Sequence, residues 1–295
     1  MVNINGIITA MVTPMHNDET VNYVELRNQV RRQVSAGVSG LFVSGTNGES
    51  YVLSEKEKLE ILTVAVDENA GKLPVYAGTG CPGTKETIEL SKQAEKLGAD
   101  VLSVITPYFA TLSQKELYDH YEALVESVSI PIVVYNMPAR TGVAINPETV
   151  EKLAKLPNIA GVKDSSGNFD NILQYIERTS DDFAVLSGND SLVLWTLQAG
   201  GKGAVCGVGN LFPETLVAVY ELWKSGDFAK AKAAQDSIRD IRDCFKFGNP
   251  NTIVKITANL LGHNVGPCRA PFHISDPKVA QEIDKVLKEK YAGMK

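Results

Sequence analysis

The chain alternates eight times between a short apolar run and a helical pattern, and this alternation limits its fold more than any other feature. The apolar runs are rich in Val, Ile and Leu without polar alternation, which is typical of parallel strands buried on both faces. We predict strands at residues 6–13, 40–44, 74–77, 101–105, 131–135, 159–163, 183–186 and 203–206, with helices between them at residues such as 55–68, 85–97 and 113–128. Asn146-Pro147 and Phe212-Pro213 mark two further helix starts, because proline suits the first helical turn.

Eight such strand–helix units predict an α/β protein of the (β/α)8 TIM-barrel type. A doubly wound sheet is the alternative, although that fold rarely needs eight such regular units. After Leu222 the strand pattern stops, and residues 227–247, 252–261 and 277–291 have helical patterns. We therefore expect a catalytic barrel at residues 1–224 and a C-terminal helical domain at residues 225–295.

Composition and charge exclude several classes of protein. The net charge is -6 and the sequence pI is near 5.4, which argues against a surface for nucleic acid or anionic membranes. The sequence contains no apolar run of membrane-spanning length and no signal-peptide pattern, so a cytoplasmic protein is expected. The four cysteines lack CxxC spacing and the four histidines form no paired motif, so we expect reduced thiols and no metal site.

Lys163 ends the apolar run 159–163, and polar turn residues follow it at once. On a strand, this position places an amine at the carboxyl end, where the active sites of (β/α)8 enzymes lie. Burial disfavours the charged form of a lysine, and a neutral amine can attack a carbonyl to form a Schiff base. The alternative is an exposed lysine that starts a turn and pairs with Asp164.

The loop after the second strand, residues 44–50, combines two glycines with polar side chains. Gly45 and Gly48 allow a tight turn with outward N–H groups, while Thr46 and Asn47 add side-chain donors. Such a nest suits a carboxylate or a phosphate. An ordinary Gly/Asn loop is the alternative.

Two more strand ends carry candidate groups. After the fifth strand, Tyr135 can shuttle protons and Arg140 offers a planar fork for a carboxylate, unless they are a packed rim tyrosine and a solvated arginine. At the end of the eighth strand, we expect Val205 and Gly207 to line the substrate site, where glycine lets the backbone approach a ligand, unless the glycines only serve a turn. Together these groups suit a 2-oxo acid held by its carboxylate while its ketone condenses with Lys163.

The run Gly78-Thr79-Gly80-Cys81-Pro82-Gly83 has the GxGxxG spacing of a dinucleotide-binding fingerprint. It follows the third predicted strand instead of the first, and Thr84-Lys85 has the wrong order for a phosphate-binding loop. We interpret this run as a loop at the rim of the pocket and expect no nucleotide cofactor.

These motifs resemble the dihydrodipicolinate synthase and N-acetylneuraminate lyase family of class I aldolases over essentially the whole chain. The motifs that carry the resemblance are Gly45-Thr46-Asn47-Gly48-Glu49, Tyr135-Asn136-Met137-Pro138-Ala139-Arg140-Thr141-Gly142 and Gly161-Val162-Lys163-Asp164. The resemblance implies a barrel with a C-terminal helical domain, assembled as a homotetramer of two dimers, and a pyruvate-dependent reaction that needs no cofactor.

The resemblance also implies roles for the strand-end residues. Lys163 would form an imine with pyruvate, and Tyr135 would shuttle protons together with Thr46. Thr46 and Asn47 would bind the pyruvate carboxylate, and Gly48 would be a further substrate-binding residue. Arg140 would receive the carboxylate of the second substrate, an aldehyde, at the entrance of the pocket.

The sequence departs from the synthase pattern at several positions. Synthases carry Thr-Pro-Tyr-Tyr, whose second tyrosine completes the proton relay of a neighbouring subunit, whereas this chain has Thr106-Pro107-Tyr108-Phe109. Phe109 has no hydroxyl to pass a proton. Asn47 replaces a threonine, and the run after Lys163 is closer to that of sugar-acid and hydroxy-oxoglutarate aldolases.

The positions of the lysine-feedback pocket of regulated synthases also match poorly. Glu55 and Lys58 stand where histidines are common, Tyr51 replaces a small residue and Pro82 replaces an asparagine. Glu86 alone fits that pocket. We therefore predict no feedback inhibition by lysine.

Three functional hypotheses follow. The preferred one is an aldolase that cleaves a 4-hydroxy-2-oxo acid or a 2-keto-3-deoxy sugar acid to pyruvate and an aldehyde. The second is dihydrodipicolinate synthase, which condenses pyruvate with aspartate semialdehyde. The third is a non-catalytic protein that binds 2-oxo acids. Phe109 favours the aldolase over the synthase, whereas Arg140 is compatible with both.

Overall fold

Eight parallel strands form a closed barrel in the computed structural model, which describes residues 2–274 and 276–293. The strands are β1 (Gly6–Ala10), β2 (Gly40–Val43), β3 (Val75–Gly78), β4 (Val101–Ile105), β5 (Ile132–Asn136), β6 (Ile159–Asp164), β7 (Ala184–Ser187) and β8 (Gly203–Cys206). They follow one another around the barrel in chain order, and β1 pairs with β8 to close it. The predicted (β/α)8 fold is confirmed, and the doubly wound alternative is wrong.

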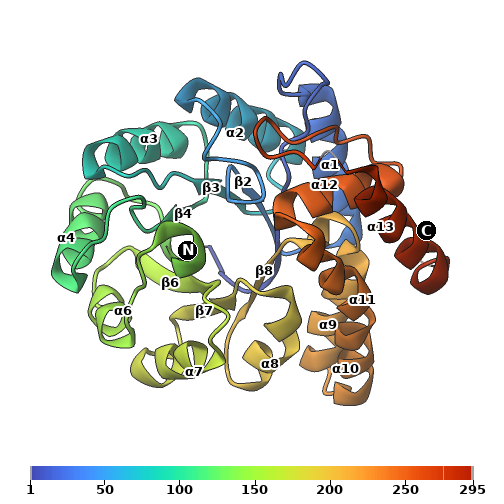
Figure 1. The fold of residues 1–295 in the computed structure, drawn as a ribbon. Coiled ribbons are helices and arrows are strands. Elements are labelled where there is room, and N and C mark those ends of the chain that lie inside the picture. Colours follow the sequence, from blue (N-terminus) through green and yellow to red (C-terminus); the bar gives the residue numbers. More distant parts are fainter. Residues whose placement is uncertain (1, 275, 294–295) are drawn as a thin grey trace.

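A ring of helices surrounds the strands (Figure 1). Its members are α1 (Tyr23–Ala36), α2 (Glu55–Asn69), α3 (Thr84–Lys96), α4 (Gln114–Val125), α6 (Pro147–Leu153), α7 (Phe169–Arg178), α8 (Val193–Gln198) and α9 (Pro213–Lys224). Three single turns, α5 (Pro138–Thr141), η1 (Asp190–Leu192) and η2 (Val208–Asn210), follow β5, β7 and β8 at the end of the barrel where the predicted site lies.

Local sequence explains where several helices begin. Ser54 and Glu57 form a reciprocal capping box at the start of α2, and Ser113 and Glu116 do the same for α4. The predicted helix starts at Asn146-Pro147 and Phe212-Pro213 are confirmed, with proline as the first residue of α6 and α9.

The first strand is shorter than predicted and ends at Ala10 instead of residue 13. The backbone N–H of Val12 donates to Oδ1 of Asn210 at 2.9 Å, so it is satisfied by a side chain from the far end of the barrel sequence. A strand pattern in the sequence cannot anticipate such a long-range partner.

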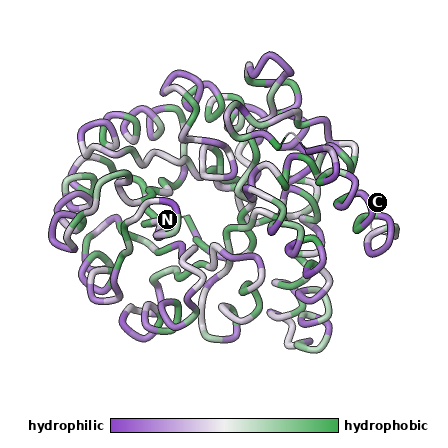
Figure 2. The backbone as a smooth tube through the Cα atoms, viewed as in Figure 1, coloured by the Kyte–Doolittle hydropathy of each residue, from purple (hydrophilic) through white to green (hydrophobic). Residues whose placement is uncertain are grey.

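The barrel has two apolar layers. Its interior is filled by side chains from alternate positions of the strands, including Ile8, Phe42, Tyr76, Val133 and Leu186. A second layer packs between the strands and the surrounding helices. Hydropathy along the chain follows this arrangement, with apolar strands in the centre and polar residues on the outer sides of the helices (Figure 2).

The helices after residue 224 gather on the side of the barrel formed by β1, β8, α8 and α9 (Figure 1). They are α10 (Phe228–Ser237), α11 (Arg239–Asp243), the 3-10 helix η3 (Cys244–Phe247), α12 (Pro250–Leu260) and α13 (Pro277–Lys290). One apolar cluster joins Leu216 of α9 to Ile241, Ile253 and Ile283. The predicted helical extension is therefore present, while its division from the barrel at residue 224 stays a prediction.

The single helix predicted at residues 227–247 is wrong, because that segment forms α10, α11 and η3. The break occurs where the Tyr291 hydroxyl enters the helical hydrogen-bond ladder. It donates to the carbonyl of Ser237 at 2.8 Å and accepts from the N–H of Ile241 at 3.0 Å. Insertion of a side chain into the ladder is a common cause of helix kinks. No helix among the described residues is long and apolar enough to cross a membrane.

Candidate active site

Lys163 is buried near the carboxyl end of β6, with 4% of its surface exposed. Its Nζ atom lies 3.8 Å from the centroid of the Tyr135 ring and 5.1 Å from that of the Phe42 ring. Asp164 forms no ion pair with Lys163. The interpretation as an exposed, turn-starting lysine paired with Asp164 is therefore wrong.

Asp164 instead fixes the end of the strand next to Lys163. Its Oδ2 accepts from the Asn136 amide at 2.8 Å, and its Oδ1 accepts from the backbone and hydroxyl of Ser166 at 3.0 and 2.6 Å. Burial raises the pKa of this carboxyl, while these donors oppose the shift. Because Asn136 belongs to β5 and Asp164 to β6, the contact ties together the two strands that carry Tyr135 and Lys163.

Tyr135 and Thr46 meet beside the lysine. Oγ1 of Thr46 lies 3.3 Å from the Tyr135 hydroxyl, at hydrogen-bonding distance, and the sulfur of Met137 accepts from both hydroxyls. Tyr135 is only 3% exposed. A phenol and an alcohol in contact next to a buried amine can pass a proton between them and a bound substrate.

A cavity of about 190 Å³ opens over these groups. Seven of the eight residues predicted for the site line it: Thr46, Asn47, Tyr135, Arg140, Lys163, Val205 and Gly207. Gly48 does not line it, since its carbonyl points to the barrel wall and accepts from the Thr13 hydroxyl at 2.7 Å. Gly207 lies against Asn47, where an added Cβ would come within 2.8 Å of the amide nitrogen, so the glycine leaves room for that side chain.

The structure adds polar residues to the site that the sequence analysis missed. Asn189 and Asp190 line the same cavity after β7, and Arg242 reaches it from α11. Arg242 donates to Oδ1 of Asn189 at 3.0 Å and lies 3.5 Å from Oδ2 of Asp190. Asn189 and Asp190 could have been found, because they directly follow a predicted strand. Arg242 has no such signal, since it lies far beyond the last strand.

A second cavity of about 180 Å³ adjoins the first and shares Thr46 and Arg140 with it. Its lining is mostly apolar and includes Tyr51, Tyr108 and Phe272, together with Gly80 of the predicted rim loop. The side chain of Arg140 donates to Asn249 at 3.1 Å at the boundary. The arginine therefore lies between the two cavities and lines both of them.

Phe109 lies outside both cavities, is fully exposed and has a backbone φ of 83°. A left-handed backbone is unusual for a bulky residue. Within one chain, Phe109 therefore contributes nothing to the site.

Comparisons with known proteins agree with the fold. Residues 3–290 match the model of the Dihydrodipicolinate synthetase family. A 4-hydroxy-tetrahydrodipicolinate synthase of Methanopyrus kandleri is 41% identical over 96% of this chain and 94% of its own length.

Two solved structures have the same fold. A dihydrodipicolinate synthase of Thermotoga maritima has a TM-score of 0.94 at 35% identity, covering 98% of this chain and 99% of its own. A dihydrodipicolinate synthase variant described as monomeric also has a TM-score of 0.94 at 35% identity, covering 97% and 96%. The predicted resemblance is thereby confirmed, and the chain belongs to the dihydrodipicolinate synthetase family of lyases.

Proposed function

We propose that this protein is a 4-hydroxy-tetrahydrodipicolinate synthase that condenses pyruvate with aspartate semialdehyde through a Schiff base on Lys163. The observation that carries this proposal is the buried amine of Lys163 above the Tyr135 ring, in a cavity that also contains Thr46 and Asn47. The names of the relatives support the synthase over the aldolase that the sequence alone favoured.

The first half of the reaction makes a carbon nucleophile from pyruvate. Thr46 and Asn47 hold the carboxylate, and the neutral amine of Lys163 attacks the ketone carbon. Tyr135 gives a proton to the departing hydroxyl, so that water leaves as the imine forms, and then takes a proton from the methyl group to give an enamine. The imine acts as an electron sink, so this covalent step replaces one difficult carbanion with easier steps.

The second half joins the two substrates. The enamine carbon attacks the aldehyde carbon, and Tyr135 delivers a proton to the aldehyde oxygen through its contact with Thr46. The amino group of aspartate semialdehyde then attacks the imine carbon and displaces Lys163, which closes the ring and frees the enzyme. Arg140, at the boundary of the two cavities, binds the carboxylate of the aldehyde substrate.

An aldolase for 4-hydroxy-2-oxo acids or 2-keto-3-deoxy sugar acids is the second candidate. Two observations favour it. Phe109 has no hydroxyl to complete a proton relay, and Asn189, Asp190 and Arg242 give the cavity a polar wall suited to several substrate hydroxyls.

We further propose a cytoplasmic homotetramer. The four free cysteines suit a reducing compartment. Exposure of the Phe109 ring favours its burial against a second copy of the chain. Sedimentation of the wild type and of Phe109→Asp tests the assembly, because a charged residue in a subunit contact shifts the species toward smaller ones. If Phe109→Asp sediments as the same tetramer as the wild type, Phe109 takes no part in the subunit contact.

The experiment that tests the function is a pyruvate balance in two arms. One arm supplies pyruvate with aspartate semialdehyde, and the other supplies a panel of 4-hydroxy-2-oxo acids and 2-keto-3-deoxy sugar acids. Consumption of pyruvate with a cyclic product in the first arm supports the synthase. Pyruvate released only in the second arm would replace it with the aldolase. Borohydride trapping of pyruvate without turnover in either arm would leave a protein that only binds 2-oxo acids.

A further inference from the structure

We propose that Lys255 and Asn251 of α12 are positioning residues that set the loop 45–49 for binding the pyruvate carboxylate. This inference rests on the proposed function, because that function gives Thr46 and Asn47 their role. It assigns an active-site task to a helix about 200 residues away in the sequence, from which Asn251 also reaches the lining of the cavity.

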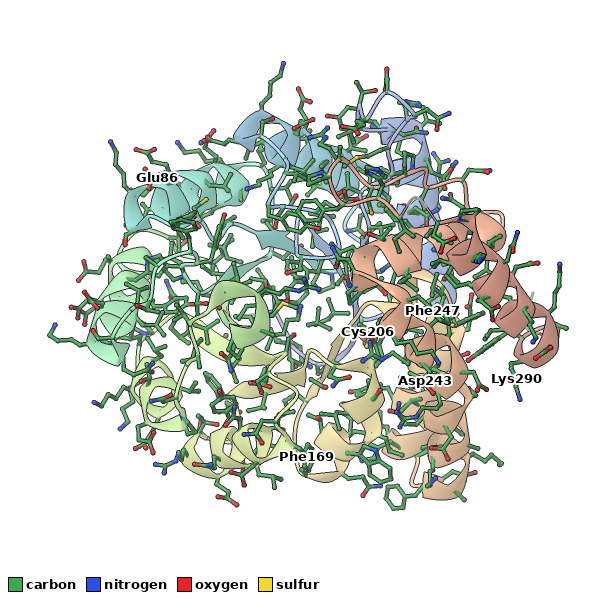
Figure 3. The ribbon with its side chains drawn as sticks, in the orientation of Figure 1. Glu86, Phe169, Cys206, Asp243, Phe247 and Lys290 are labelled. Atoms are coloured by element: carbon green, nitrogen blue, oxygen red, sulfur yellow. The ribbon has the colours of Figure 1, made fainter. Side chains whose placement is uncertain are left out.

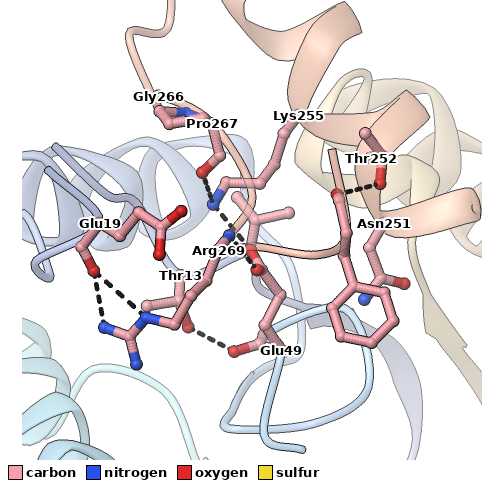
Figure 4. Close-up of polar contacts among 12 residues, drawn as sticks. Thr13, Glu19, Glu49, Asn251, Thr252, Lys255, Gly266, Pro267 and Arg269 are labelled. Carbon is pink, nitrogen blue, oxygen red and sulfur yellow. Dashed lines mark hydrogen bonds and ion pairs between the residues drawn. The ribbon is translucent and has the colours of Figure 1, made fainter. Parts of the chain in front are cut away.

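The loop and the helix are joined by an ion pair that is almost completely buried (Figure 4). Glu49 is 0% exposed and Lys255 is 1% exposed, and Nζ of Lys255 lies 2.7 Å from Oε1 of Glu49. Nζ also donates to the carbonyl of Pro267 at 2.5 Å, and Oε2 of Glu49 accepts from the N–H of Arg269 at 2.9 Å. Both charged groups therefore have further partners, as a buried pair requires.

A buried ion pair restrains the arrangement of the groups that it joins more than it stabilises the fold. Removing two charges from water costs free energy that their attraction often fails to recover, whereas the pair tolerates only a narrow range of arrangements. The loop needs that restraint, because Ser44 and Glu49 have left-handed backbones with φ of 55° and 60°. Residues other than glycine hold this conformation only where the surroundings enforce it.

Asn251 reaches the catalytic end of the loop directly. Its Nδ2 donates to the carbonyl of Thr46 at 2.5 Å and to the hydroxyl of Tyr51 at 2.8 Å. On the opposite side, the Thr13 hydroxyl holds the carbonyl of Gly48. The backbone of the loop is thus fixed from the barrel and from α12 at once, and the Thr46 hydroxyl stays 3.3 Å from that of Tyr135.

Lys163 does not depend on these contacts, since it belongs to β6 and is held by the sheet. Loss of the anchor should therefore weaken pyruvate binding while leaving the amine able to form an adduct at saturating pyruvate. General loss of structure would reduce both. This difference separates a positioning role from a purely structural one.

The test uses Asn251→Ala and the double variant Glu49→Gln/Lys255→Met, which removes both charges and leaves neither unpaired. Asn69→Ala is the matched control, because Asn69 is also 2% exposed and donates to a backbone carbonyl, that of Leu73, at 2.7 Å. Asn69 ends α2 and touches neither the loop nor the cavity. Each protein is titrated with pyruvate under borohydride, and the adduct is measured by intact mass.

We expect the pyruvate concentration at half-maximal trapping to rise on the order of 10- to 100-fold in both anchor variants, because small misplacements of binding groups have effects of this size. The final extent of trapping stays at the wild-type level, and Asn69→Ala titrates like the wild type. Folded anchor variants with wild-type half-saturation would overturn the inference. If the wild type itself traps no pyruvate, the proposed function fails, which is a different result. Should the double variant not fold, Asn251→Ala alone decides.

Discussion

The Nζ atom of Lys163 lies 3.8 Å from the centroid of the Tyr135 ring, and the two residues are direct partners across β5 and β6. The register of two neighbouring strands therefore sets the distance between the proposed nucleophile and the proposed proton shuttle. Because both residues are almost fully buried, this arrangement has little freedom to change.

Lys163→Ala is expected to abolish turnover and the borohydride adduct with pyruvate, because Lys163 is the one lysine among the described residues that line the cavity. Lys155→Ala, which removes an exposed lysine, is the control and should behave like the wild type. Pyruvate consumption measures turnover, intact mass measures the adduct, and circular dichroism checks that the variant is folded. Turnover at the wild-type rate in a folded Lys163→Ala variant would refute the Schiff-base mechanism.

Tyr135→Phe separates the phenol from the ring. The ring under Lys163 remains, so pyruvate is still trapped, whereas the hydroxyl that contacts Thr46 is lost. We expect kcat to fall roughly 10²- to 10⁴-fold, the usual contribution of a positioned acid or base. Tyr121→Phe is a matched control, because it removes a buried hydroxyl that donates to the Val104 carbonyl outside the cavity. Near-normal kcat in Tyr135→Phe would move proton transfer to another group.

The part of the site carried by strand ends could be predicted from the sequence. Lys163, Tyr135 and Thr46 each end or follow an apolar run, and parallel strands bring their carboxyl ends to one face. The same argument covers Asn189 and Asp190, which were overlooked. Arg242, Asn251 and Lys255 were beyond its reach, because helices after the barrel return to the site through contacts that no local pattern encodes.

The same limit applies to the fold. Hydrophobic runs locate the strands to within a few residues, since burial on both faces leaves a strong local signal. The break between α10 and α11 depends on Tyr291, a residue about 50 positions away, and the sequence there still has a helical pattern. Contacts with residues far away in the sequence thus set the ends and breaks of these elements, which the hydrophobic periodicity alone does not predict.

L-lysine at millimolar concentration is expected to leave the initial rate unchanged. Glu86, the one residue that fits the feedback pocket, lies on α3 at the outer rim of the molecule (Figure 3). Lys58 brings a positive charge, like that of the lysine ligand, to one position of that pocket, and Pro82 lacks the side-chain amide of the asparagine that it replaces. Initial rates over a lysine titration check this. Inhibition that depends on lysine concentration would show that other residues rebuilt the pocket.

Gly161→Ala is expected to destabilise the barrel next to Lys163. An added Cβ would lie 2.4 Å from the carbonyl oxygen of Ala184, a backbone atom of β7, so the two strands would have to separate. Overpacking of this kind costs about 1–3 kcal/mol in the free energy of unfolding. Gly293→Ala is the control, since nothing lies within 4 Å of its added Cβ. Urea denaturation measures both, and equal midpoints would contradict the predicted clash.

Glu57 links pH to stability through Arg269. The guanidinium donates to both carboxylate oxygens, at 2.7 and 3.1 Å, and lowers the pKa of Glu57 from its ordinary value to about 2. A carboxyl with a depressed folded pKa contributes stability above its unfolded pKa, and that contribution is lost as the pH falls toward the folded pKa. Glu57→Gln should therefore cost roughly 1–2 kcal/mol at neutral pH, with the difference from the wild type shrinking between about pH 5 and pH 2.

Glu116→Gln provides the comparison for this pH effect. Glu116 occupies the same capping-box position in α4, but Ser113 supplies its hydrogen bonds and no arginine pairs with it. Urea denaturation of the three proteins over this pH range should give a large, pH-dependent difference for Glu57→Gln and a small one for Glu116→Gln. Equal differences for the two variants would assign the effect to the capping box, and the Arg269 pair would then contribute nothing measurable.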